Sequence, residues 1–255
     1  MLGGGSLAQE RTPTGTAHVE DEDTVIELRQ YTLRGGQRDT LITLFEQRFV
    51  EPQNAVGAHV IGTFRDLDDP DRFVWIRGFR DMNARPQALS AFYGGPVWLA
   101  HRAAANAMMV DSDNVLLLRP SEPGPLFAPQ RAGIQGNGSI ITATIFYLSG
   151  VEAAAFVRFF EQAILPRIEA AGAKSIAQLV SEEVPNNFSR LPIRERDRVF
   201  LWFARWPNIA AEEAFAARMS AVTGWRDAAP ESVLPALMRK PERLRLAPTP
   251  RSALR

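Results

Sequence analysis

Arginine, tyrosine, tryptophan and histidine residues recur at alternate positions in three short segments of the first half of the chain. Side chains alternate between the two faces of a β-strand, so residues two positions apart lie on the same face. The polar and aromatic face predicted in this way contains Glu27, Arg29, Tyr31, His59, Arg65, Trp75 and Arg77. Arginine forms paired hydrogen bonds with carboxylate, phosphate and enolate oxygens, so this face predicts a binding site for a small anion.

Within this face, we expect Arg29, Arg65, Trp75 and Arg77 to contact the ligand. The alternative is that Arg65 and Arg77 form structural ion pairs, either with Glu27 or with the aspartates of residues 66–71. Structural ion pairs leave the same charge pattern in a sequence as binding sites do, so both interpretations stay open.

The candidates for proton transfer are Tyr31, His59 and His101. Histidine titrates near neutral pH and is a common acid–base group. His101 follows Trp98 by three residues in a segment that Pro96 predicts to begin a helix, so both side chains share one helix face. The alternative for His101 is a hydrogen-bonded residue at an interface. We expect no cofactor; haem bound through a histidine is an alternative that no motif supports.

The segment FYGGPVW, residues 92–98, places two glycines between aromatic residues. Glycine permits close backbone approach, so Tyr93 and Trp98 are further ligand-binding candidates at the mouth of a pocket. A tight corner between two helices would explain the segment equally well. It is not a phosphate-binding loop, because neither GxxxxGK nor GxGxxG occurs.

Composition excludes several classes of protein. The chain has 255 residues and no cysteine, which excludes disulfides and thiolate metal sites, and we expect no metal. Its net charge is zero, so nucleic acid is not an expected partner. It has no apolar run long enough to span a membrane and no signal-peptide pattern at its start, which predicts a cytoplasmic protein. Arginine greatly outnumbers lysine, which suggests a GC-rich bacterial genome.

The elements that must position these residues follow the order β-α-β-β-α-β. Predicted strands cover residues 24–33, 59–67, 72–79 and 114–120, with helical periodicity after the first strand and around Pro96. The same order returns in the second half. Residues 44–58 align with 159–173, residues 73–79 with 200–206, Trp98 with Trp225, and 118–120 with 246–248. The insertion between the first two matches falls in the loop NNFSRLPIRERD.

This repeat predicts an α+β fold of two tandem ferredoxin-like units. The predicted divisions are a disordered acidic tail at 1–23, a first unit at 24–120, a linker at 121–138, a degenerate second unit at 139–248 and a basic tail at 249–255, which we expect to be solvated. Each unit has one uncovered sheet face, so the two sheets should face one another in an intramolecular α/β barrel. We expect the aliphatic strand residues under the helices and the polar face inside the barrel. Edge strands and apolar surface predict a homodimer.

Residues 66–120, together with ELRQYTL and FEQRFVEPQNAVGAHVIGTFRD, closely resemble the NIPSNAP family. The resemblance implies a dimeric α/β-barrel arrangement of ferredoxin-like units. Met108 stands where the family usually has threonine. The second half lacks FYGGPVW, the ANA segment at 105–107 and DSDN at 111–114. The second half therefore resembles a degenerate copy, whose site is in doubt.

Two functions follow from these patterns. The first is binding of a small, anionic or aromatic ligand inside the barrel, with cofactor-independent monooxygenase-like or isomerase-like chemistry as an extension by fold analogy. The second is a scaffold or interaction protein without chemistry. An open barrel interior with converging arginines would support the first, and a filled barrel with every arginine paired would support the second. The sequence does not decide whether the chain is an enzyme.

Overall fold

The chain folds into two units of the same β-α-β-β-α-β order. A computed structural model describes residues 23–122, 138–221 and 229–255. Nearly all of the predicted acidic tail and linker, and also Trp225, lie outside these residues. The first unit consists of β1 (Val25–Leu33), α1 (Arg38–Arg48), α2 (Val50–Asn54), β2 (His59–Asp66), β3 (Arg72–Phe79), α3 (Ala84–Gly94), α4 (Pro96–Met108) and β4 (Met109–Pro120).

The second unit repeats this order with a more broken set of helices. It consists of β5 (Ile140–Tyr147), α5 (Ala153–Phe159), the π-helix η1 (Phe160–Ile164), α6 (Leu165–Ala170), β6 (Lys174–Ser181), β7 (Val199–Trp206), α7 (Ile209–Ala221), the 3-10 helix η2 (Glu231–Val233), α8 (Leu234–Met238) and β8 (Glu242–Pro248). No helix in the described part of the chain is long and apolar enough to cross a bilayer.

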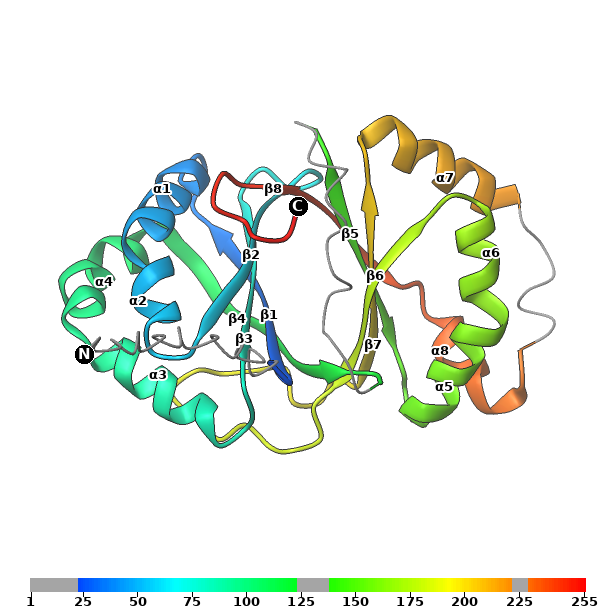
Figure 1. Ribbon diagram of the computed structural model, residues 1–255, viewed down its shortest axis with the longest axis horizontal. Coiled ribbons are helices and arrows are strands. Elements are labelled where there is room, and N and C mark those ends of the chain that lie inside the picture. The colour runs from blue at the N-terminus through cyan, green and yellow to red at the C-terminus, as the bar shows by residue number, and fades with distance from the viewer. Residues whose placement is uncertain (1–22, 123–137, 222–228) are drawn as a thin grey trace, which may run out of the picture.

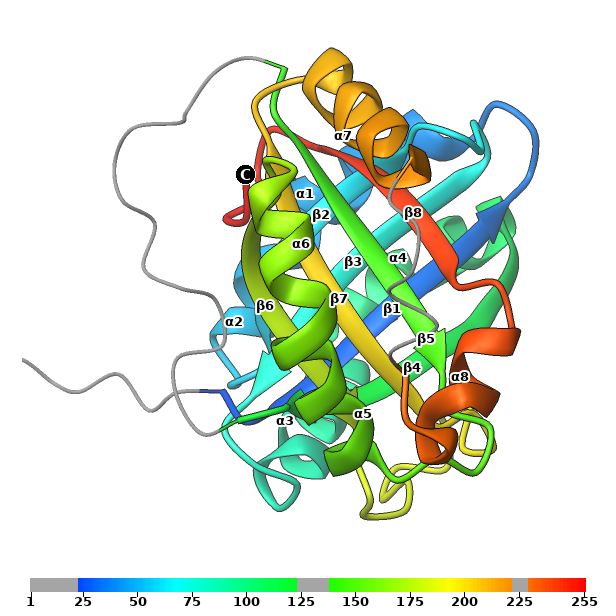
Figure 2. The same cartoon turned by 90° about the vertical axis from the view of Figure 1, so that its right-hand side faces the viewer.

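The eight strands close into one antiparallel barrel in the order β1-β3-β2-β8-β5-β7-β6-β4. The helices α1–α4 cover the outside of the first unit's strands, and α5–α8 cover the opposite side of the molecule (Figures 1 and 2). The predicted intramolecular α/β barrel of two ferredoxin-like units is therefore confirmed. Because the barrel is closed, it has no edge strand, so the edge-strand reason for expecting a homodimer is lost.

The two units meet along two short seams. β2 pairs with β8 through Phe64↔Pro248 to Asp66↔Leu246, and β4 pairs with β6 through Leu118↔Ser181 to Pro120↔Leu179. The C-terminal residues extend the first seam, because the backbone N–H groups of Thr249 and Leu254 donate to carbonyl oxygens of β2. The predicted solvated tail is thus wrong for these residues: Thr249, Ser252 and Leu254 are buried.

Charge complementarity explains why this basic segment docks. Glu46 of α1 is buried and accepts hydrogen bonds from the Thr249 hydroxyl at 2.5 Å and the Arg251 backbone N–H at 2.8 Å. Arg251 also pairs with Glu51. Ser252 donates its side-chain hydroxyl to the Leu254 carbonyl oxygen and accepts from the Thr63 backbone N–H. Glu46 and Glu51 of the first unit therefore bind the C-terminal segment that follows the second unit.

The barrel interior is filled by aliphatic and phenylalanine side chains from both sheets. Its residues include Leu28, Ile76, Leu116, Leu201 and Phe203, all at most 2 % exposed. The expected orientation of the sheet faces is therefore wrong. The polar and aromatic face lies under the helices, where Tyr31 and Trp75 pack with Phe45 and Phe49 of the helical layer. The helices carry polar side chains that bond to the buried charges, whereas the barrel interior is lined by aliphatic and phenylalanine side chains.

Candidate functional site

A buried ion cluster occupies the space between the first sheet and its helices. Glu27 of β1 is fully buried, and its Oε2 accepts hydrogen bonds from Arg29 Nη1 at 2.7 Å and Arg77 Nε at 2.8 Å. Its Oε1 accepts from Arg85 Nε at 2.8 Å. The structural ion pair that the sequence offered as the alternative for Arg77 is therefore present. Arg85, on α3, was not among the predicted residues, because one arginine in a helix carries no signal of its own.

The cluster is strongly electropositive. Burial alone would raise the pKa of Glu27, but the charges of Arg77, Arg29 and Arg85 outweigh burial and hold this pKa far below its usual range. Three guanidinium groups face one carboxylate, so the cluster contains two positive charges more than negative ones. All four side chains are at most 2 % exposed, so solvent does little to screen this excess.

Neutral oxygen atoms accept several further guanidinium donors. Arg29 donates to Tyr31 Oη at 3.1 Å, and Arg77 donates to Gln53 Oε1 at 2.9 Å and Tyr93 Oη at 3.4 Å. Arg85 Nη1 donates to the side-chain oxygens of Asn186 and Asn187, in the β6–β7 loop of the second unit. That loop contains the insertion noted in the sequence, whose role in covering the cluster the sequence did not predict.

A small pocket adjoins the cluster and gathers several of the predicted ligand-binding residues. Tyr31, Trp75, Tyr93 and Trp98 line it together with Gln53 and the helical phenylalanines. Its volume is only about 30 Å³, enough for a small anion or two water molecules. Tyr93 and Trp98 come from the two sides of the α3–α4 corner, with ring centroids 4.9 Å apart. Segment 92–98 is thus both a helix corner and part of a pocket wall.

The remaining predicted residues lie elsewhere. His59 is half-exposed and contacts Asp23 at 2.9 Å, and Arg65 pairs with Asp39 at 2.8 Å on the surface. His101 lies at the edge of the helical layer, with its ring 6.4 Å from that of Phe49. Neither histidine lines the pocket beside the cluster. A β-bulge explains why His59 does not lie on the predicted face. The pairing of β2 with β3 shifts between Val60 and Gly62, so the side chains before the bulge point to the opposite face.

The second unit presents the equivalent sheet face with different residues. The pair Glu27↔Arg77 corresponds to Thr142↔Ala204, and Arg29↔Trp75 corresponds to Thr144↔Trp202. In the helical layer, the alignment of the two halves places Ile168 where the first half has Gln53. Short or apolar residues thus replace two arginines, a glutamate and a glutamine.

These replacements accompany a larger cavity. A pocket of about 220 Å³ lies between the second sheet and its helices. Its walls are mainly aromatic and aliphatic, and three arginines also border it; the lining residues are Thr144, Phe146, Phe160, Ile164, Arg167, Ile168, Trp202, Phe215, Met219, Leu237, Arg239, Pro241 and Arg243. The π-helix η1 begins at Phe160 and ends at Ile164, both in this wall. Such π-turns occur frequently at functional sites.

The arginines bordering this pocket differ in their partners. Arg243 pairs with Glu212 of α7, and Arg167 donates to the Ala163 carbonyl oxygen one turn earlier. The Arg239 guanidinium lies 3.4 Å from the ring centroid of Tyr147. Among the residues that the structure describes, no carboxylate pairs with Arg239. It is therefore available to an anionic group.

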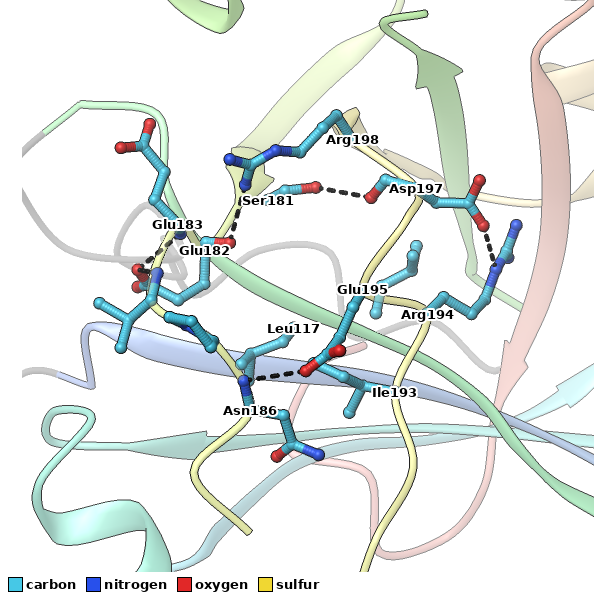
Figure 3. A pocket seen from close by; sticks show the side chains of 13 residues that line it. Leu117, Ser181, Glu182, Glu183, Asn186, Ile193, Arg194, Glu195, Asp197 and Arg198 are labelled. Carbon is cyan, nitrogen blue, oxygen red and sulfur yellow. Dashed lines mark hydrogen bonds and ion pairs between the residues drawn. The ribbon is translucent and has the colours of Figure 1, made fainter. Parts of the chain in front are cut away.

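A third pocket, of about 240 Å³, lies beneath the β6–β7 loop (Figure 3). Its polar groups bond mainly to one another: Glu195 accepts from the Asn186 backbone N–H, Arg194 donates to Asp197, and Arg198 donates to the Glu182 carbonyl oxygen. Arg194 also donates to Tyr147 Oη at 2.8 Å, and Tyr147 donates to Glu242 at 2.6 Å. Burial, followed by the hydrogen bond to Glu242, raises the pKa of Tyr147. This network holds the loop that supplies Asn186 and Asn187.

Two solved structures that match most of this chain show the same fold. The chain is similar to an anthrone oxidase-like protein, with 12% identity, a TM-score of 0.54, and coverage of 91% of this chain and 94% of that one. A proposed monooxygenase from Fusobacterium nucleatum has 9% identity and a TM-score of 0.52, covering 89% and 93%. A NIPSNAP family protein from Agrobacterium tumefaciens has 19% identity and a TM-score of 0.37, covering 41% and 91%.

Sequence comparisons concern the first half of the chain. No curated protein sequence matches this chain. Residues 26–123, which contain Glu27, the three clustered arginines and the α3–α4 corner, match the sequence model of the NIPSNAP family. The predicted resemblance of the first unit to the NIPSNAP family is therefore confirmed over these residues.

Proposed function

We propose that this protein binds a small amphipathic molecule, with an apolar body and a carboxylate group, in the pocket between the second sheet and its helices. The observation that carries this proposal is the 220 Å³ cavity with apolar walls and guanidinium groups on its border. Ligand sites typically combine such walls with a few polar groups that orient the ligand. The volume lies just below the usual range of about 300–1,000 Å³, which favours a ligand smaller than a typical drug.

The contacts of the cavity assign a role to each end of this ligand. Phe146, Phe160 and Trp202 would contact the apolar body, since their aromatic side chains line the cavity. Arg239 would bind the carboxylate, because its guanidinium stacks on Tyr147 and has no acidic partner in the described part of the chain. A guanidinium binds a carboxylate through two parallel hydrogen bonds. The expectation of an anionic or aromatic ligand is thus retained, but its place moves from the barrel interior to the second unit.

The lining supports binding more directly than catalysis. Among the described residues that line this cavity there is no histidine, aspartate, glutamate or tyrosine, so a general base would have to come from the ligand or from elsewhere. The shared fold with a proposed monooxygenase and with an anthrone oxidase-like protein is the support for a cofactor-independent oxygenase as the second candidate. In that case an aromatic substrate that itself supplies the electrons for oxygen reduction would occupy the same cavity, and oxygen uptake would accompany its oxidation.

A scaffold protein without a ligand is the competing function. The filled barrel and the paired arginines of the first unit support it. A homodimer remains a proposal, supported by the exposed apolar residues Leu99 and Val110 on α4 and β4.

Isothermal titration calorimetry with octanoate and 1-naphthoate tests the proposal, with 1-octanol and naphthalene as analogues that lack the carboxylate. We expect saturable binding of both acids and an affinity at least tenfold lower in Arg239→Gln. The matched control is Arg158→Gln, which removes an exposed arginine of α5 outside the pocket. A bulkier side chain in the cavity, Thr144→Leu, should weaken all four compounds. The proposal fails if no compound binds, or if Arg239→Gln and Arg158→Gln bind the acids equally.

A further inference from the structure

The pocket of the first unit has an unusual set of hydrogen-bond donors. Arg29 donates to the Tyr31 hydroxyl oxygen, and Arg77 donates to that of Tyr93. Each phenol oxygen thus acts as an acceptor, and in the described part of the chain neither hydroxyl donates to another protein atom. A phenol that accepts from a guanidinium is a stronger donor, because hydrogen bonds in a chain polarise one another. Both hydroxyl protons remain for a partner in the pocket.

Trp75 supplies a third donor. Its side chain is 1 % exposed and lines the pocket, and its Nε1 has no partner among the described residues. The equivalent Trp202 of the second unit donates its Nε1 to Ser175 Oγ at 3.0 Å. Ser175 pairs with Ala204 as Val60 pairs with Arg77, so Val60 occupies the position of that serine. The first unit therefore lacks the internal acceptor that the second unit has, and a buried donor without an acceptor is costly.

The charge of the surroundings identifies the missing acceptor as an anion. Glu27 is the one carboxylate bonded to the three arginines, and the cluster retains two uncompensated positive charges. Burying unpaired charge is unfavourable, so an anion in the adjoining pocket would stabilise the cluster. A neutral ligand or water would satisfy the donors without offsetting the charge.

We propose that Tyr31, Tyr93 and Trp75 form a second binding site, in the first unit, for a small carboxylate such as formate or acetate. The size of the pocket sets this limit, because about 30 Å³ accepts a group of three or four non-hydrogen atoms and not an aromatic ring. The site differs in ligand size from the cavity of the second unit. Formate and acetate should therefore bind in the first unit, and octanoate and naphthoate in the second.

Nuclear magnetic resonance of the indole N–H groups tests this site directly. The full chain, uniformly labelled with ¹⁵N, is titrated with sodium formate at constant ionic strength maintained with sodium chloride. We expect the Trp75 resonance, identified by its loss in Trp75→Phe, to move downfield and saturate with a dissociation constant of about 1 mM, near the limit for a ligand of three heavy atoms. The Trp202 resonance is the internal control, since its N–H already has an acceptor.

Three variants separate binding from a general effect on stability. Tyr31→Phe combined with Tyr93→Phe should weaken formate binding at least tenfold and leave the folded spectrum intact. Val60→Ser restores the acceptor found in the second unit, so it should move the Trp75 resonance without formate and reduce its response to formate. Tyr147→Phe, a phenol outside this pocket, should bind formate as the unaltered chain does.

Two results would overturn the site. One is a Trp75 resonance that formate moves no more than chloride does, as expected if water fills the pocket. The other is saturable formate binding that survives the loss of both hydroxyls. Octanoate and naphthoate are too large for this pocket, so failure of formate binding would leave the proposed function unaffected. Failure of octanoate and naphthoate binding would likewise leave the formate site unaffected.

Discussion

Replacing Glu27 by glutamine should destabilise the protein more than any other single loss of a charge in the first unit. The substitution keeps the side-chain volume but removes the carboxylate that receives three guanidinium groups at 2.6–2.8 Å. Removing one partner of a buried ion pair costs about 3–5 kcal/mol. Because Glu27 neutralises more than one arginine, we expect the upper end, about 5 kcal/mol. That is a large share of the roughly 5–15 kcal/mol that stabilises a typical domain.

Urea unfolding followed by circular dichroism measures this loss. With a slope of about 2.5 kcal/mol per molar urea, the expected change lowers the midpoint by about 2 M. Glu242→Gln is the matched control, because Glu242 is also hydrogen-bonded but only half-buried, and it should lose less than about 2 kcal/mol. A rescue variant combines Glu27→Gln with methionine at Arg29, Arg77 and Arg85, which removes all the charges at similar volume. It should recover most of the lost stability.

The same residue predicts a dependence on pH. The pKa of Glu27 is lowered in the folded state from an ordinary value of 4.5. Its contribution to stability is therefore fully present above pH 4.5 and is lost as the pH falls from there toward the folded-state pKa. In that range the unfolded chain takes up the proton first, which costs about 1.4 kcal/mol per pH unit for this one group. Glu27→Gln should lack this part of the acid sensitivity.

Two results would refute this reasoning. If Glu27→Gln loses less than about 1 kcal/mol, the arginines do not depend on the carboxylate, and the cluster is satisfied in some other way. If the rescue variant is as unstable as Glu27→Gln alone, the loss arises from packing and not from unpaired charge.

Three further perturbations test other contacts. Gly62→Ala should destabilise by about 1–3 kcal/mol in thermal unfolding, because its Cβ would lie 2.5 Å from the Phe64 ring. Truncation after Pro248 should abolish the slow hydrogen exchange of the Thr63 amide, which donates to Ser252; unchanged protection would contradict the docked tail. Alanine at both Asn186 and Asn187 should cost about 2–4 kcal/mol in urea unfolding, because Arg85 Nη1 loses its acceptors. Alanine at the exposed Asn54 is the control, which measures the cost of losing an ordinary loop contact.

The internal repeat made the fold predictable, whereas the orientation of the sheet faces was not. Alternation correctly groups Glu27, Arg29 and Tyr31 on one face, since that follows from strand geometry alone. It does not say which buried layer that face meets, because both faces of a barrel sheet are covered. The deciding partners, Arg85 and Gln53, lie on helices, and their contacts with the strands depend on how the helices pack. The bulge in β2 added a second error by turning His59 away from that face.

The second unit shows that loss of a sequence motif can accompany a larger cavity. Its departures from the first half suggest a degenerate copy whose site is in doubt. Yet replacing Arg77 and Arg29 by Ala204 and Thr144 removes the side chains that fill the first unit, and the Trp75 position keeps its aromatic ring as Trp202. The charged strand residues that are conspicuous in the sequence of the first half bond to its helices and fill the space beneath them. In the second unit, where these charges are absent, an apolar cavity is present. In a sequence, the residues that line an apolar cavity are hard to distinguish from those of an ordinary core.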